Sequence, residues 1–76
     1  MEEEKELTFG EKAVGIGFNP SMKDDVNVVK RSFSRLIDLC NEKQMSSYLG
    51  NLIKGAAIRS CIECQMIIVK LITLKE

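Results

Sequence analysis

Apolar side chains recur at steps of three and four residues through the middle of the chain. They are Val26, Val29, Phe33, Leu36, Ile37 and Cys40. This spacing puts them on one face of a helix over residues 22–42, and we expect that face to be buried. Ser21, followed three residues later by Asp24, fits a helix start in which a hydroxyl accepts backbone N–H groups, so the helix is predicted to begin there.

A second, longer apolar pattern follows a polar break over residues 41–47. It predicts a helix that has Ser46 or Ser47 as its N-cap and covers about residues 46–74. Because a short connection between two long helices favours an antiparallel arrangement, the two helices are expected to form a hairpin. The predicted fold class is all-α, with this helical hairpin over residues 21–76.

The second predicted helix is apolar on more than one side. One stripe consists of Ile53, Ala57, Cys61, Cys64, Ile68 and Ile72, a second of Ile58, Ile62, Met66 and Val69, and a third of Ile67 and Leu71. A single partner helix cannot cover all three stripes, and a chain of 76 residues has little core of its own. We expect other copies of the chain to cover them, because closed homo-oligomers are the commonest assemblies of soluble proteins.

Residues 1–20 lack a helical pattern of this strength. Gly10, Gly15 and Gly17, followed by Asn19-Pro20-Ser21, predict an irregular N-terminal arm. Two local alternatives stay open within it, an extended segment over residues 13–18 and one loose helical turn over residues 6–12.

The charge and composition of the chain argue against some classes of binding partner. Eleven basic residues balance eleven acidic ones, so the chain has no net field to attract a nucleic-acid polymer or an anionic membrane. The most apolar segment, residues 58–72, is interrupted by charges and too short to span a bilayer. An odd number of cysteines, three, and an acidic start in place of a secretory signal favour a reducing cytoplasm.

The equipment of an enzyme is missing from the sequence. There is no histidine, so the usual general base and the commonest metal ligand are absent. Cys61-Ile62-Glu63-Cys64 spells C-x-x-C, but it lies inside an apolar helix, where cysteines pack as small hydrophobes. A zinc site needs four ligands, so the three cysteines could complete one only by sharing between subunits or by recruiting a carboxylate, and we set it aside. We therefore predict no catalysis, no metal and no cofactor.

The best candidate for a binding site is the arm together with the start of the first long helix. Phe18, Asn19 and Ser21 precede backbone N–H groups that suit an anion, and Lys30 is one of the cations along the same helix. The alternative is that these cations, with nearby acidic residues, form an ordinary solvated face. Arg59 lies four residues before Glu63, which fits a modest pair within one helix.

Two stretches, read together, resemble the phage anti-CBASS sponge family, whose hairpin domain is shared with an anti-Thoeris sponge family. The first stretch is Phe18-Asn19-Pro20-Ser21, then Val26, Val29-Lys30 and Leu36-Ile37-Asp38. It resembles three motifs of the family: an N-P-S turn, a helix with the pattern V-x-x-[IV]-K, and the tripeptide L-I-D. The second stretch, Ser60-x-x-Glu63-x-Gln65-Met66-x-x-Val69-Lys70-x-Ile72-Thr73, resembles T-x-[IL]-E-x-A-x-M-x-x-V-K-x-[IL]-T. Cys64 and Ile67 stand where the family often has alanine and an aromatic residue.

The resemblance implies a non-catalytic homohexamer in the cytoplasm of an infected bacterium. Such proteins sequester cyclic dinucleotides, such as cyclic GMP-AMP, in pockets between subunits, and some also hold cyclic trinucleotides elsewhere. By the same resemblance, Lys30 lies near the phosphates, Phe18 or alternatively Phe9 stacks on a base, and Arg59 belongs to a second pocket. The rival interpretations are a helical hairpin that docks onto a host or phage protein without nucleotide, and an enzyme that degrades the nucleotide.

Overall fold

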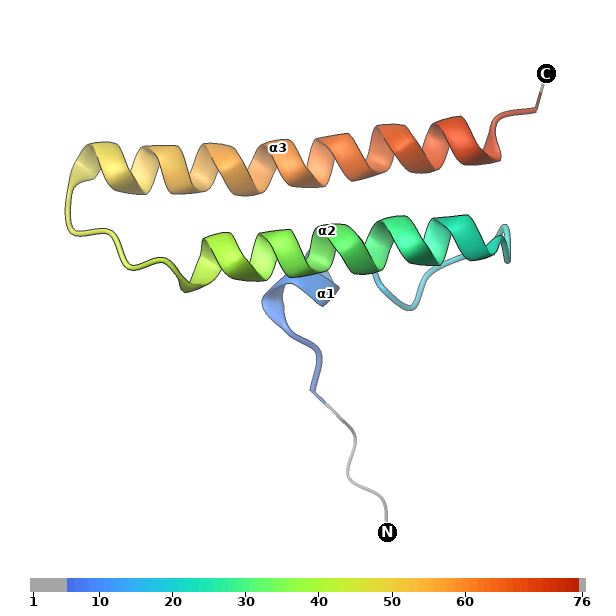
Figure 1. Ribbon diagram of the computed structural model, residues 1–76, viewed down its shortest axis with the longest axis horizontal. Helices are drawn as coiled ribbons and strands as arrows, with labels where there is room; N and C mark the ends of the chain where they lie inside the picture. Colours follow the sequence, from blue (N-terminus) through green and yellow to red (C-terminus); the bar gives the residue numbers. More distant parts are fainter. Residues whose placement is uncertain (1–5, 76) are drawn as a thin grey trace, which may run out of the picture.

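The protein consists of three helices in the computed structural model, which describes residues 6–75. They are α1 (Phe9–Val14), α2 (Asp24–Glu42) and α3 (Tyr48–Thr73). The two long helices run antiparallel side by side, and the short helix α1 packs across α2 and also contacts α3 (Figure 1). No strand occurs among the described residues. The all-α hairpin is confirmed, while residues 1–5 of the predicted arm and residue 76 lie outside the described residues.

The start of α3 follows the predicted capping chemistry. Ser47 is the N-cap, and its hydroxyl accepts a hydrogen bond from the backbone N–H of Gly50 at 2.9 Å. This bond satisfies one of the N–H groups that a helix start leaves unpaired. The helix covers Tyr48–Thr73, one or two residues shorter at each end than the predicted range of 46–74.

The predicted start of the first long helix at Ser21 is wrong. The N-cap of α2 is Lys23, and its side chain makes no capping hydrogen bond. The Ser21 hydroxyl accepts from the Lys23 backbone N–H at 3.3 Å and donates to Oδ1 of Asn19 at 2.6 Å. Between Ser21 and Lys23, Met22 has a φ of 58°. This left-handed conformation changes the direction of the chain just before the helix begins.

The predicted irregular arm contains a helix, because Phe9–Val14 forms α1. Its start is a capping box in which Thr8 Oγ1 accepts from the Glu11 N–H and Glu11 Oε1 accepts from the Thr8 N–H. Its end is Gly15, whose φ of 64° few other residues adopt easily. The extended alternative for residues 13–18 fails, and the loose turn over residues 6–12 is close to what forms.

A close backbone contact holds α1 on α2. A Cβ built on Gly10 would overlap the Ser34 carbonyl oxygen and lie 2.9 Å from Asp38 Oδ1, so only glycine fits without movement. The same carboxylate accepts a hydrogen bond from the Gly10 backbone N–H at 2.7 Å. Asp38 therefore neutralises part of the positive end of α1 from a position 28 residues further along the chain.

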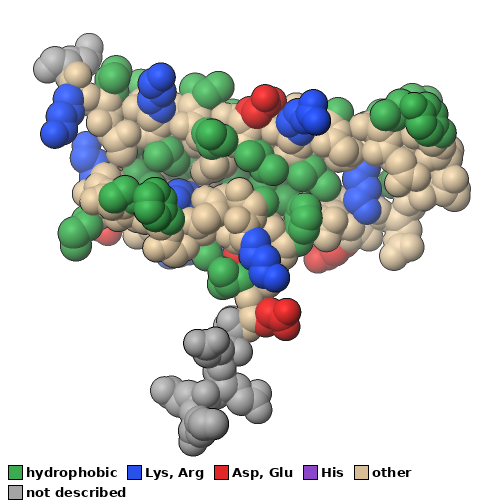
Figure 2. Space-filling view, turned by 180° about the vertical axis from the view of Figure 1, so that it is seen from behind, with side chains coloured by type: hydrophobic (Ala, Val, Ile, Leu, Met, Phe, Trp, Pro, Cys, Tyr) green, Lys and Arg blue, Asp and Glu red, His purple; other side chains and the backbone are tan. Residues whose placement is uncertain are grey.

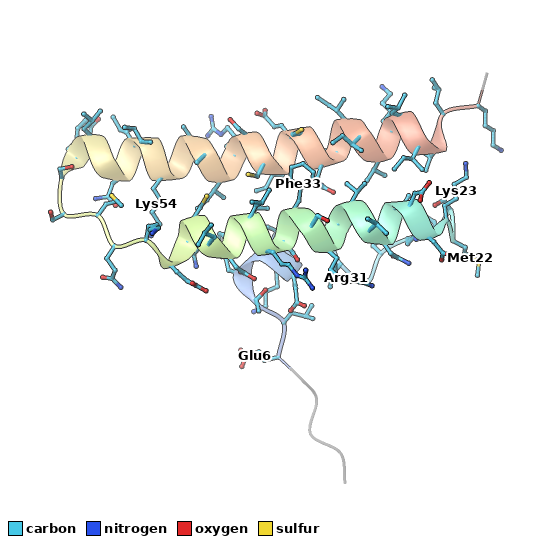
Figure 3. All side chains as sticks on the ribbon, viewed as in Figure 1. Glu6, Met22, Lys23, Arg31, Phe33 and Lys54 are labelled. Atoms are coloured by element: carbon cyan, nitrogen blue, oxygen red, sulfur yellow. The ribbon has the colours of Figure 1, made fainter. Side chains whose placement is uncertain are left out.

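The hydrophobic core of the described chain is small. The buried apolar side chains are Val14, Val26 and Ile37. The other members of the apolar stripe on α2 are only partly buried, and Leu36 is 48% exposed, contrary to prediction. Phe33 lies between the two long helices (Figure 3).

Large apolar side chains remain exposed along α3. They are Tyr48, Leu49, Leu52, Ile53, Met66, Ile67 and Leu71, with Leu74 just beyond the helix. Figure 2 shows one face of the molecule, on which hydrophobic side chains gather along the junction of the two long helices. As predicted, one hairpin does not cover this helix. None of the described helices combines the length and apolarity that a membrane crossing requires.

Candidate functional site

A groove of about 600 Å³ opens on the described part of the protein. Residues from all three helices line it: Lys12, Ala13, Val14, Gly15, Phe18, Lys30, Gln65, Met66, Val69, Lys70 and Thr73. We call this hollow the three-helix groove. Its charged members are three lysines, and no carboxylate of the described residues 6–75 lines it. The groove is therefore suited to an anion with apolar surface.

Lys30 is the most buried cation of the groove, with 6% of its surface exposed. Its ammonium group donates hydrogen bonds to the backbone oxygens of Gly15, at 3.0 Å, and Phe18. It also lies 5.4 Å from the centre of the Phe18 ring, within range of a cation–π interaction. Lys30 thus fixes the turn over residues 15–18, and these two bonds use two of its three donors.

Phe18 is the exposed aromatic side chain of the groove. The side chain is 69% exposed, and it also borders a smaller hollow of about 240 Å³ formed with the N-P-S turn. The backbone of Phe18 is fixed, but the face of its ring is exposed. The ring can therefore stack on a flat ligand without first moving out of a packed position.

Asn19 and Ser21 are used within the turn that they belong to. Asn19 Oδ1 accepts from the Ser21 hydroxyl and from the Met22 N–H, while its amide nitrogen donates to the Lys23 carbonyl and to Asn27 Oδ1. These bonds account for both polar ends of the Asn19 side chain. The turn therefore positions Phe18, and it lines the smaller hollow together with Lys30.

The other two predicted contacts lie elsewhere. Phe9 begins α1 and does not line the three-helix groove. Arg59 lines a separate depression on α3, with Asn51 and Gly55 among its neighbours. Both Arg59 and Glu63 are exposed, as a modest pair on the surface of one helix would be. The structure therefore brings Phe18, Asn19, Ser21 and Lys30 together and leaves Phe9 and Arg59 apart.

Most residues of the groove were not among the predicted contacts, and they include Lys12, Gln65 and Lys70. Lys12 was missed because α1 was not expected, although the Thr8-x-x-Glu11 spacing of a capping box was present in the sequence. Lys70 and Gln65 belong to the stretch that carries the resemblance, but nothing in the sequence shows that α3 turns them toward α1. Their roles depend on the packing of three helices.

The three cysteines are free and lie outside the groove. Burial raises the pKa of the Cys61 thiol, and the neighbouring Cys40 and Cys64 raise it further. A raised pKa keeps the thiol protonated and poorly nucleophilic at neutral pH. Cys64 is exposed in the protomer, contrary to the expectation that all three pack as core residues. Among the described residues, no group of three potential metal ligands comes together.

No family model matches the chain, and neither a curated protein nor a solved structure matches it. The resemblance to the sponge families stays a prediction. The case for function therefore rests on the lysines, the aromatic ring and the apolar walls of the three-helix groove.

Proposed function

We propose that this protein is a phage anti-defence sponge, which binds a cyclic dinucleotide such as cyclic GMP-AMP without degrading it. The observation that carries the proposal is the three-helix groove, whose lining combines Lys12, Lys30 and Lys70 with apolar side chains and the exposed ring of Phe18. Sequestration in the cytoplasm of the infected bacterium then keeps the signal from activating CBASS effectors.

The chemistry of a cyclic dinucleotide matches this groove. Its two phosphates carry two negative charges, which lysine ammonium groups pair with, and its bases offer flat faces to an aromatic ring. Stacking of one base on Phe18 is worth roughly 1–3 kcal/mol. A volume of about 600 Å³ lies within the range of pockets that hold small ligands.

Assembly is the second part of the proposal. The exposed apolar side chains of α3 give copies of the chain a surface on which to associate, and the resemblance favours a hexamer. In the same proposal, the depression beside Arg59 is the place for a second ligand, such as a cyclic trinucleotide.

One rival function is supported by the same exposed surface. A hairpin with an apolar helix can dock onto a host or phage protein through α3 and bind no nucleotide. The three lysines of the groove favour the sponge, because docking through Ile and Leu side chains gives no reason for cations around an aromatic ring.

The test is isothermal titration calorimetry with cyclic GMP-AMP, followed by mass spectrometry of the ligand after the complex is denatured. The informative variant is Lys12→Gln/Lys70→Gln. Losing one charged hydrogen bond removes about 1.5 kcal/mol, so we expect binding at least tenfold weaker. Lys30→Glu is a poorer variant, because it also removes the two bonds that hold residues 15–18.

The matched control is Arg31→Gln/Arg35→Gln, which removes the same charge from exposed positions on α2 that do not line the groove. Arg31 lies on the side of α2 away from α3 (Figure 3). We expect the control to bind like the original chain and the ligand to be recovered intact. Absence of heat, or equal loss in both double variants, would contradict the sponge, and cleaved ligand would indicate an enzyme.

A further inference from the structure

Gln65 is a buried polar side chain with an unused acceptor. It is 4% exposed, and its Oε1 atom accepts no hydrogen bond from any described residue. Of the α3 residues that line the three-helix groove, it is the only buried one. The amide therefore lies deep in the wall of the proposed ligand site.

The other buried polar side chains in the described residues are both paired. The Lys30 ammonium donates to Gly15 and Phe18, and the Ser34 hydroxyl donates to the Arg31 carbonyl at 2.8 Å. Burying an amide oxygen without a partner lowers stability, and an apolar side chain of similar length would avoid that loss. An unpaired group of this kind in a native fold calls for an explanation, and a ligand that supplies the missing donor is one.

The chemistry of the groove indicates which part of the ligand supplies the hydrogen-bond donor to Gln65. The ionised phosphates of a cyclic dinucleotide accept hydrogen bonds and give none, and the three lysines are suited to them. Oε1 needs an N–H or O–H group. Bases carry such groups on their edges, and glutamine pairs with the amino group of adenine in nucleic-acid recognition. The ring of Phe18 borders the same groove, so a base can stack there with its edge toward α3.

We propose that Gln65 reads the base of the bound nucleotide, with its Oε1 accepting a hydrogen bond from the exocyclic amino group of a purine stacked on Phe18. This inference rests on the proposed function and adds specificity to it. A site built to pair with a donor discriminates strongly against a ligand that lacks it, because the buried acceptor is then left unpaired.

The experiment compares the full chain with Gln65→Met, which keeps the length of the side chain and removes the amide. Both proteins are titrated with cyclic GMP-AMP and with cyclic di-IMP, whose bases have no exocyclic amino group. We expect the original chain to bind cyclic GMP-AMP at least tenfold more tightly than cyclic di-IMP. In Gln65→Met this preference should fall to about twofold or less, through weaker binding of cyclic GMP-AMP.

A second measurement separates recognition from a structural role. Thermal unfolding without ligand should give Gln65→Met a midpoint equal to or above that of the original chain, since an unpaired buried group is removed. Ser34→Ala is the control, because it removes a paired buried hydroxyl outside the groove. It should keep the base preference.

The outcomes are distinguishable. If Gln65→Met keeps the preference for cyclic GMP-AMP, or if the original chain binds both nucleotides equally well, the role of Gln65 is overturned while the sponge stands. A lowered unfolding midpoint with unchanged affinities would make Gln65 a structural residue. If the original chain binds no cyclic dinucleotide, both proposals fall.

Discussion

At the residue scale, Cys61 shows how a small change of environment alters chemistry. Its side chain is partly buried on α3, and burial is the main reason that the pKa of its thiol lies above the ordinary value of 9.0. Cys40 and Cys64 act in the same direction, because a thiolate at either position would repel a second negative charge. The folded protein therefore holds this proton more tightly than the unfolded chain.

The pH dependence of stability follows from that shift. Below about pH 9 the thiol is protonated in both states, and its contribution to stability is fully present. As the pH rises above 9, the unfolded thiol ionises first, so the free energy of unfolding falls until the folded thiol also ionises. Urea unfolding under reducing conditions at pH 8, 9 and 10 measures this slope.

Two cysteine variants make that measurement specific. Cys61→Ala should lose less stability between pH 8 and pH 10 than the original chain, even if its stability at pH 8 is lower. Cys64→Ala, at an exposed position, should keep most of the original slope. A Cys61→Ala slope as steep as that of the original chain would show that other groups cause the alkaline loss.

Lys30 marks the limit of prediction at this scale. The sequence shows a lysine beside an apolar stripe, which is equally consistent with a solvated face and with a ligand contact. Its partners are the carbonyls of Gly15 and Phe18, and they come within reach only because α1 ends at Gly15. Four of the predicted contacts, Phe18, Asn19, Ser21 and Lys30, do line one hollow, but the arrangement of their side chains depends on the three-dimensional packing.

At the scale of elements, the two long helices were predictable and α1 was not. The long helices have apolar periodicity over five turns or more, and α3 begins at the expected N-cap Ser47. A six-residue helix has too few positions to show periodicity, and it is stabilised by contacts with α2 rather than by propensity. The Thr8–Glu11 capping box was its one local sign.

The contact between α1 and α2 gives a prediction with opposing effects. Gly10→Ala would gain up to about 1 kcal/mol from helix propensity. The new methyl group would overlap the Ser34 carbonyl, a backbone atom that cannot turn aside. Overpacking of this kind costs about 1–3 kcal/mol, so we expect net destabilisation by up to about 2 kcal/mol in urea unfolding. Ligand binding should weaken too, because displacing α1 moves Lys12 away from the groove.

Gly17→Ala is the matched control for that variant. Nothing lies within 4 Å of a Cβ at this position, and its φ is not in the left-handed region. A surface change of this kind stays within about 0.5 kcal/mol. If Gly10→Ala unfolds at the same urea concentration as Gly17→Ala, α1 is not held on α2 by the close contact at Gly10.

At the scale of the whole molecule, α3 is the dominant feature. Its apolar stripes point in several directions, and the hairpin covers only part of them, so that Ile67 and Leu71 are 67% and 70% exposed. This imbalance was predictable from the sequence, because a helix that is apolar nearly all round exceeds what one neighbour can bury. The sequence pattern does not show what covers the exposed stripes, because that depends on the shape of the surface.

The proposed self-assembly gives a prediction in which folding and association separate. Ile67→Lys puts a charge on a side chain that the protomer leaves exposed, so the helix content should not change. Burial of one isoleucine at an interface is worth about 1.5–3 kcal/mol in each subunit, and a buried unpaired ammonium adds a larger penalty. Light scattering should therefore give an oligomer for the original chain and a monomer for Ile67→Lys, with equal helical circular dichroism.

Ser32→Lys is the control for charge alone, because Ser32 is an exposed polar position on α2. It should assemble like the original chain. A monomeric original chain would contradict self-assembly and make the surface of α3 a site for a different protein. An oligomeric Ile67→Lys would place the contact between copies on the other apolar positions of α3, such as Leu49 and Ile53, where the same substitution would then be expected to dissociate it.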